Sequence, residues 1–119
     1  IAYCLGLPDR IESGVGALDF GSLSGLTFCE PDFSRFPCLK LAYEAMQAGG
    51  GAACVLNAAN EEAVAAFLAG RIRFTDIERV VAESLDKNVS DGLHDIGGLL
   101  AQDAQTRSNA QQYIAALRG

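Results

Sequence analysis

Glycine-rich stretches are the first candidates for chemistry, because a glycine loop between a strand and a helix can hold phosphate groups. Two such stretches occur, Gly14-Val15-Gly16 and Gly49-Gly50-Gly51. The first lacks a third glycine and a helical pattern after it. The second lacks a preceding buried strand and the Gly-Lys-Ser ending. We therefore expect turns or helix caps at both places and no phosphate site.

Acidic pairs are the second candidates, since two carboxylates can act as general acid and base or hold a divalent metal. Glu61-Glu62 and Asp76/Glu78 both fall in the first turns of predicted helices, where a negative charge suits the helix dipole. Capping therefore suffices to explain them. We predict that they take no part in catalysis.

The single histidine, His94, stands next to Asp95, and no Gly-x-Ser-x-Gly motif accompanies it. A hydrolytic triad is therefore not indicated, and a zinc site would need His or Cys ligands at tight spacing. We predict that this chain contains no catalytic residue, no cofactor-binding residue and no metal-binding residue.

Four cysteines lie in apolar surroundings without any Cys-x-x-Cys pair: Cys4, Cys29, Cys38 and Cys54. Cytosolic proteins keep their thiols reduced, and free cysteine is among the residues most often found in protein cores. We interpret the four as buried free thiols, with a disulfide pair as the alternative.

Length and charge limit the class of protein. A chain of 119 residues with 50% hydrophobic composition suits one domain and an appendage. The net charge of -6 disfavours nucleic acids and anionic membranes as partners. No uncharged apolar run approaches the roughly 20 residues that cross a bilayer, so we expect a soluble protein. Because the chain opens on an apolar run at Ile1 without a methionine, we expect a fragment of a larger protein.

The first part of the chain predicts little regular structure. Residues 1–7 are typical of a helix end, stopped by Pro8. Glycines and serines make 11–25 a loop-rich connector. Residues 26–29 are β-branched and aromatic between Gly25 and Pro31, which favours one short strand. A single strand needs a pairing partner outside this chain or in a second copy.

The remainder of the chain has the apolar period of helices. Pro37 begins the first helix, and Gly49 follows it. The second helix lies within 51–70, with Asn57 and Asn60 as candidate N-caps. Its inward residues are predicted to be Val64, Phe67 and Leu68, and Gly70 closes it. The predicted apolar stripe of the first helix comprises Cys38, Leu41, Ala42, Ala45 and Met46.

Two more helices complete the pattern. Thr75 caps the third, with Glu78 at the capping-box position, and 86–94 is predicted as a loop. Asp95 caps the last, weakened at its start by Gly97-Gly98. The buried stripe of the third helix is predicted as Ile77, Val80, Val81 and Leu85. That of the last is predicted as Ile96, Leu99, Leu100, Ala104, Ala110, Tyr113, Ile114 and Leu117.

The predicted fold class is therefore mainly α: a small antiparallel four-helix bundle over 36–119, preceded by a loop-rich connector with one short strand.

A set of short motifs follows in order along nearly the whole chain. These motifs are Leu7-Pro8-Asp9-Arg10, Ser13-Gly14, Leu18-Asp19-Phe20, Leu26-Thr27-Phe28, Glu30-Pro31-Asp32, Phe36-Pro37-Cys38-Leu39-Lys40-Leu41-Ala42, Val55-Leu56-Asn57-Ala58-Ala59-Asn60-Glu61, Phe67-Leu68 and Ile72-Arg73-Phe74-Thr75-Asp76-Ile77. In order and spacing this set resembles the C-terminal part of the 1-deoxy-D-xylulose 5-phosphate reductoisomerase family. The resemblance weakens after about residue 78, where only Asp103 and Arg107 of the last helix still match.

The resemblance implies a cytoplasmic, homodimeric enzyme of the non-mevalonate isoprenoid pathway. It converts 1-deoxy-D-xylulose 5-phosphate to 2-C-methyl-D-erythritol 4-phosphate with NADPH and a divalent metal, magnesium or manganese. It also implies that 1–35 are the end of the catalytic domain and a connector arm. Residues 36–119 would be the C-terminal helical domain, whose partner is the rest of the parent enzyme. We expect this fragment alone to be inactive. The alternative is a free-standing helical protein-interaction module.

Overall fold

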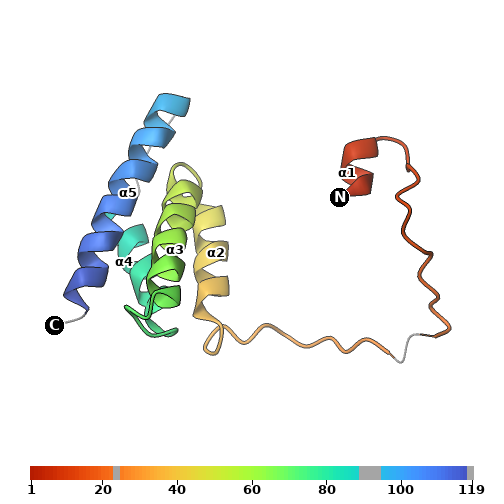
Figure 1. The fold of residues 1–119 in the computed structure, drawn as a ribbon, viewed down its shortest axis with the longest axis horizontal. Coiled ribbons are helices and arrows are strands. Elements are labelled where there is room, and N and C mark those ends of the chain that lie inside the picture. The colour runs from red at the N-terminus through yellow and green to blue at the C-terminus, as the bar shows by residue number, and fades with distance from the viewer. Residues whose placement is uncertain (23–24, 89–94, 118–119) are drawn as a thin grey trace. The chain divides into compact units, whose positions relative to one another are not determined.

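The computed structural model describes residues 1–22, 25–88 and 95–117 and divides the chain into two compact units, Ile1–Glu30 and Pro31–Gly119. Helix α1 lies in the first unit and helices α2 to α5 in the second (Figure 1). Within the described residues the helices are α1 (Ala2–Gly6), α2 (Pro37–Ala48), α3 (Ala52–Leu68), α4 (Asp76–Asn88) and α5 (Ile96–Ala116). The mainly helical class predicted from the sequence is confirmed.

The first unit contains little regular structure. Helix α1 ends at Gly6, and Leu7 takes an extended conformation before Pro8, as predicted. The strand expected at 26–29 is not formed, since these residues are neither strand nor helix. The physical reason is that a strand exists only when its backbone groups pair with a neighbour, and no strand occurs among the described residues.

Helix α2 starts after a turn that Asp32 organises. The Asp32 carboxylate accepts the backbone N–H groups of Ser34 and Arg35, each at 3.0 Å, and Pro37 occupies the first turn of the helix as predicted. The predicted apolar stripe of α2 is only partly correct, because Ala45 alone is buried and Met46 is 67% exposed.

Helix α3 begins earlier than predicted. Its N-cap is Gly51, so Asn57 and Asn60 lie inside the helix and the caps assigned to them are wrong. Alanine is the best helix former, which lets the helix run from Ala52 without a polar cap. The end is as predicted: Gly70 takes a left-handed φ of 67° and Arg71 N–H donates to the Ala66 carbonyl at 2.9 Å, a Schellman motif.

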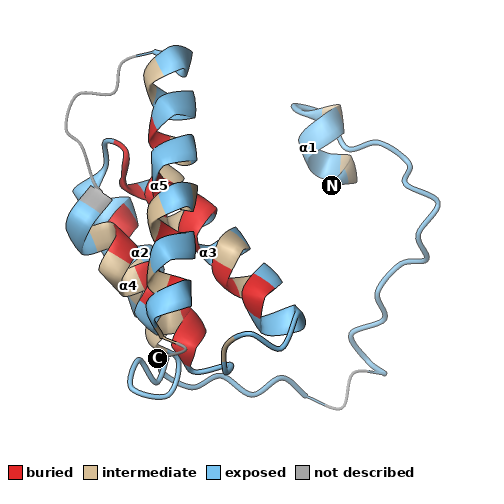
Figure 2. Cartoon of the chain, turned by 60° about the vertical axis from the view of Figure 1, so that its left-hand side comes forward, coloured by how far each residue is buried: buried red, intermediate tan, exposed pale blue. Residues whose placement is uncertain are grey.

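Small side chains form the buried face of α3, which packs against α2, α4 and α5. Val64, Phe67 and Leu68 were predicted to face inward, yet Val64 is half-buried and Leu68 is 77% exposed. Alanine lets neighbouring helices approach closely from several sides, and larger residues remain at the edges. Figure 2 shows the buried segments on the facing sides of these helices. The buried residues of α3 are Ala52, Val55, Ala58, Ala59, Ala63 and Ala66.

Helices α4 and α5 close the core. Ile77, Val80 and Val81 of α4 are buried as predicted, and Thr75 immediately precedes the helix, at the predicted cap position. Asp95 caps α5 as predicted, accepting the Gly98 N–H at 2.6 Å. The predicted loop residues 89–94 lie outside the described part of the chain.

The buried stripe of α5 differs from the prediction in its first half. Gln102, Thr106, Ala110 and Ile114 are buried at a strict spacing of four. Ile96, Leu99, Leu100 and Ala104 are exposed, although they were predicted to be inside. The two buried polar residues satisfy each other, because the Gln102 amide donates to the Thr106 hydroxyl at 3.2 Å.

No helix in the described ranges is long and apolar enough to span a membrane.

Candidate functional site

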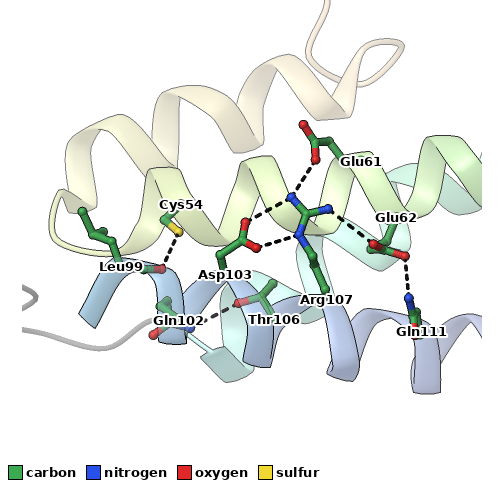
Figure 3. A network of polar contacts seen from close by, with 9 residues as sticks. All are labelled: Cys54, Glu61, Glu62, Leu99, Gln102, Asp103, Thr106, Arg107 and Gln111. Atoms are coloured by element: carbon green, nitrogen blue, oxygen red, sulfur yellow. Dashed lines mark hydrogen bonds and ion pairs between the residues drawn. The ribbon is translucent and has the colours of Figure 1, made fainter. Parts of the chain in front are cut away.

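Arg107 of α5 is the centre of a polar cluster that joins α5 to α3 (Figure 3). Its guanidinium donates to Asp103 on the same helix at 2.7 Å, and to Glu61 at 2.6 Å and Glu62 at 3.4 Å on α3. Gln111, one turn further along α5, donates to Glu62 at 2.9 Å. We call these five residues the Arg107 clamp.

The clamp explains the state of its charges. Hydrogen bonding by Arg107 holds the pKa of Asp103 below its ordinary value, and the hydrogen bonds to Asp103 and then Glu61 raise the pKa of Arg107. Arg107 thus stays cationic and Asp103 anionic at neutral pH. The contacts of Arg107 with Glu61 and Glu62 join α5 to α3.

The clamp also corrects the sequence interpretation of Glu61 and Glu62. Both lie in the middle of α3, well past its first turn, so the capping role assigned to them is wrong. The structure instead places both carboxylates beside Arg107, one of the two residues of the last helix that match the family motifs. Sequence reasoning missed this pairing because the partners are 46 and 45 residues apart in the chain.

A second polar cluster surrounds Asp76 at the start of α4. The 5%-exposed Asp76 accepts from the backbone N–H of Arg73 at 3.0 Å, from its Nε at 3.1 Å and from Nη1 of Arg79 at 3.3 Å. Hydrogen bonds from the Arg73 guanidinium, then from the Arg73 backbone, lower the pKa of Asp76 to about 2. This carboxylate fixes the turn into α4. Glu78, the other member of the predicted pair, faces a different feature.

That feature is an open apolar cavity of about 660 Å³, which we call the aromatic groove. It lies where the turn before α2, the middle of α3 and the start of α4 meet. Its lining comprises Ser34, Arg35, Phe36, Pro37, Cys38, Leu39, Asn60, Val64, Phe74, Thr75, Ile77 and Glu78. Phe74 is 72% exposed and its ring meets Phe67 edge-on, with centroids 5.6 Å apart.

The cysteines are not the buried thiols predicted from their apolar neighbours. Cys4, Cys29 and Cys38 are exposed and Cys54 is half-buried, and all four are free. Cys54 donates weakly to the Leu99 carbonyl at 3.5 Å. Partial burial, and then the charge of Glu78, raise the pKa of the Cys38 thiol, which lines the aromatic groove. Its thiolate is therefore disfavoured.

The described residues contain neither a cluster of possible metal ligands nor a glycine loop that follows a strand. They contain no group of three His, Cys, Asp or Glu side chains arranged around one point, and the carboxylates that do converge are held by Arg107 or by Arg73. Gly14 lies in a loop and Gly49 ends α2, so neither follows a strand as a phosphate loop does. His94 lies outside the described residues.

Comparison with protein families decides what the chain is part of. Residues 1–109 match the family described as the DXP reductoisomerase C-terminal domain. The chain belongs to this family. The resemblance stated from the short motifs is thereby confirmed.

The curated relatives are whole reductoisomerases. The chain is 51% identical over 119 residues to 1-deoxy-D-xylulose 5-phosphate reductoisomerase of Cupriavidus metallidurans, covering 100% of this chain and 30% of that protein. The enzyme of the same name from Shewanella halifaxensis is 50% identical over 117 residues, covering 98% and 30%. The chain thus spans under a third of the length of these relatives.

Solved structures agree with this placement. A DOX-P reductoisomerase in complex with magnesium superimposes with a TM-score of 0.89 and 40% identity, covering 99% of this chain and 32% of that one. The reductoisomerase of Zymomonas mobilis in complex with NADPH gives a TM-score of 0.86 and 38% identity, covering 95% and 30%. The chain therefore shares the fold of a part of each of these proteins that makes up about a third of its length.

Proposed function

We propose that this chain is the structural C-terminal domain of an enzyme that converts 1-deoxy-D-xylulose 5-phosphate to 2-C-methyl-D-erythritol 4-phosphate, using NADPH and magnesium or manganese. The domain contributes no catalytic, cofactor-binding or metal-binding residue. On its own it is inactive. Its role is structural: the packed helices support the rest of the enzyme.

The Arg107 clamp is the observation that carries the structural role. The carboxylates of α3 and α5 that a metal or proton-transfer site would use are bound by a guanidinium from the same domain. A side chain that neutralises its neighbours in this way stabilises helix packing, and truncating it leaves carboxylates in mutual repulsion. The clamp therefore favours a scaffold over an active site.

Carboxamide variants in the intact protein test this proposal. NADPH oxidation is followed with 1-deoxy-D-xylulose 5-phosphate and Mg²⁺ or Mn²⁺ for Glu61→Gln and Asp103→Asn. Glu44→Gln, which removes an exposed carboxylate 3.4 Å from Lys40, serves as control. We expect kcat and the metal requirement to stay within about twofold of wild type while the melting temperature falls for the clamp variants only.

Two results would contradict the proposal. A loss of about 100-fold or more in kcat at unchanged melting temperature would make a clamp carboxylate part of the catalytic machinery. Micromolar binding of NADPH to the isolated chain in calorimetry would give the fragment a cofactor site.

The division into functional regions is proposed with it. Residues 1–35 are the end of the catalytic domain and the connector arm, and 36–119 are the C-terminal domain, in which α2 to α5 form one small antiparallel bundle. The split of the structure into compact units after Glu30 supports a boundary in this region. In the intact enzyme residues 26–29 pair as a strand with the catalytic domain, which supplies the partner that this chain lacks.

We also propose that the intact enzyme is a cytoplasmic homodimer. In the isolated chain, Leu18, Phe20 and Phe28 are 65%, 77% and 90% exposed, and burying such side chains is favourable by about 1.5 to 3 kcal/mol each. We expect the isolated chain to associate through this arm at micromolar concentration. Sedimentation of the chain and of a truncation that starts at Ser34 tests it, since the truncation should lose the association.

The free-standing interaction module is the less supported function. It predicts a protein of about this length, whereas the curated relatives are more than three times longer. The mass of the expressed natural protein distinguishes the two.

A further inference from the structure

The aromatic groove exposes several large apolar side chains to solvent. Phe36, Leu39 and Phe74 are 55%, 41% and 72% exposed, and all three line the same cavity. Aromatic side chains that gather around one hollow, with polar groups at its edge, are typical of a surface that another segment covers.

Several residues that line the groove belong to the motifs that this chain shares with the family. Three of the stretches that carry the resemblance meet there: Phe36 to Leu39 at the start of α2, Asn60 on α3, and Phe74 to Ile77 at the start of α4. Packing within the helical unit explains only part of this convergence. Ile77 belongs to the core cluster and Val64 packs against it, whereas Phe36, Leu39 and Phe74 lie outside that cluster.

We propose that the aromatic groove is the docking surface for an apolar segment of the catalytic part of the same enzyme, the part that precedes this chain. The inference rests on the proposed function, since it needs the missing part to exist. About 70% of the length of the curated relatives has no counterpart in this chain, and the matched family is a C-terminal domain.

The connection makes docking within one molecule favourable. The part that precedes Ile1 is covalently joined to the groove through the 33 residues before Ser34. A covalent tether raises the effective concentration of the attached segment, which reaches the millimolar range for short flexible linkers. An intramolecular occupant therefore has the advantage over a second copy in solution at micromolar concentration.

The chemistry of the groove specifies the occupant. Its lining is mainly apolar, and among the described residues that form it the charged side chains are Arg35 and Glu78, whose opposite charges balance. The Arg35 guanidinium stacks over the Phe36 ring at 5.5 Å from its centroid. A neutral floor of this kind suits large aliphatic or aromatic side chains of a helix or strand, with Asn60 and Thr75 available to its backbone. A phosphorylated sugar or a dinucleotide would find no net positive charge.

Cys38 provides a direct measurement, because its thiol lines the groove and is exposed in this chain. The rate of maleimide labelling of Cys38, followed by peptide mass spectrometry at one pH, is compared between the intact protein and the 119-residue chain. We expect labelling to be at least about tenfold slower in the intact protein. Equal rates would overturn the proposal. Protection of Cys38 that rises with the concentration of the isolated chain would assign the groove to a second copy and would overturn it as well.

A pair of matched variants adds a second measurement. Phe74→Asp places a charge in the groove, and Leu100→Asp places one at a similarly exposed position of α5, a helix that does not line it. In the intact protein Phe74→Asp should restore the fast labelling of Cys38, while Leu100→Asp should label as slowly as wild type. Equal melting temperatures of the two variants in the isolated chain show that the fold is kept. Identical labelling of both variants at the wild-type rate would contradict the docking.

The two proposals fail in different ways. An intact protein that does not turn over 1-deoxy-D-xylulose 5-phosphate but still protects Cys38 refutes the proposed function and leaves the docking intact. An active protein with fully reactive Cys38 refutes the docking alone.

Discussion

The two compact units differ in how far their apolar side chains are buried. In Ile1–Glu30 the large side chains are exposed, with Phe28 at 90% and Leu5 at 79%. In Pro31–Gly119 the core consists largely of alanine and β-branched residues, several at 0% exposure. None of the described residues of the first unit is buried, because hydrophobicity stabilises a fold only when a partner surface removes the side chain from water. Small residues with suitable neighbours therefore stabilise more than large ones without.

Hydrogen exchange should give the largest contrast between the units. Amides of Val80 and Val81, which are buried in α4, should exchange about 1,000-fold or more slowly than amides in 1–22, because core amides open only with global unfolding. The measurement needs a dilute, monomeric sample so that association of the arm does not protect it. Comparable protection of the two regions would show that the first unit is as stably folded as the second.

Core truncation should give the next largest effect. Ile114→Ala removes a side chain that is 1% exposed and packs in the core cluster, and it should lower the free energy of unfolding by about 3 kcal/mol. Leu18→Ala in the first unit and Ile96→Ala at the exposed start of α5 should each change it by less than about 0.5 kcal/mol. Urea denaturation measures all three. A large effect of Leu18→Ala would show that the first unit packs on a core after all.

Acid should weaken the second unit through Asp76. Because the folded-state pKa of Asp76 is lowered to about 2, below the usual value near 3.9, its contribution is complete above pH of about 4. It is lost as the pH falls from about 4 to about 2. Asp76→Asn should lower the urea midpoint at pH 7, and the difference from wild type should shrink towards pH 2. A difference that stays constant over this range would contradict the Arg73 contact as its cause.

The smallest effect expected is the loss of one helix cap. Thr75→Ala should cost about 1 kcal/mol, because Thr75 precedes the first residue of α4 and its hydroxyl suits an N-cap. Thr27→Ala, in the first unit, should cost close to nothing. Equal midpoints for the two variants in urea would show that Asp76 and Arg73 alone fix the start of α4.

Helix identity followed from local chemistry, and burial did not. Pro37, Gly70 and Asp95 marked a helix start, an end and a cap in the sequence, and the structure has all three. The sequence pattern predicts large apolar residues in the core of α3 and α5, yet Leu68 and Leu100 are exposed, while Ala59 and Thr106 are fully buried. Periodicity identifies a face of a helix, but the space between neighbouring helices decides which face is buried and what size of side chain fits.

The candidate sites show the same limit. The sequence indicated that the glycine stretches, His94 and the acidic pairs form no recognisable active-site motif, but it could not say what Glu61 and Glu62 do instead. Their partner Arg107 comes from a helix some 45 residues later. The aromatic groove likewise joins three distant stretches, so no single motif could reveal it.

By itself, the sequence determined the helical class, the family and most helix boundaries, because caps, proline, glycine and ordered motifs act over a few neighbouring residues. Only the tertiary structure decided which faces are buried, how the carboxylates of α3 are neutralised and where exposed aromatic side chains gather. Those features depend on distances between residues far apart in the chain, which are set when helices pack and exclude water from the surfaces that fit.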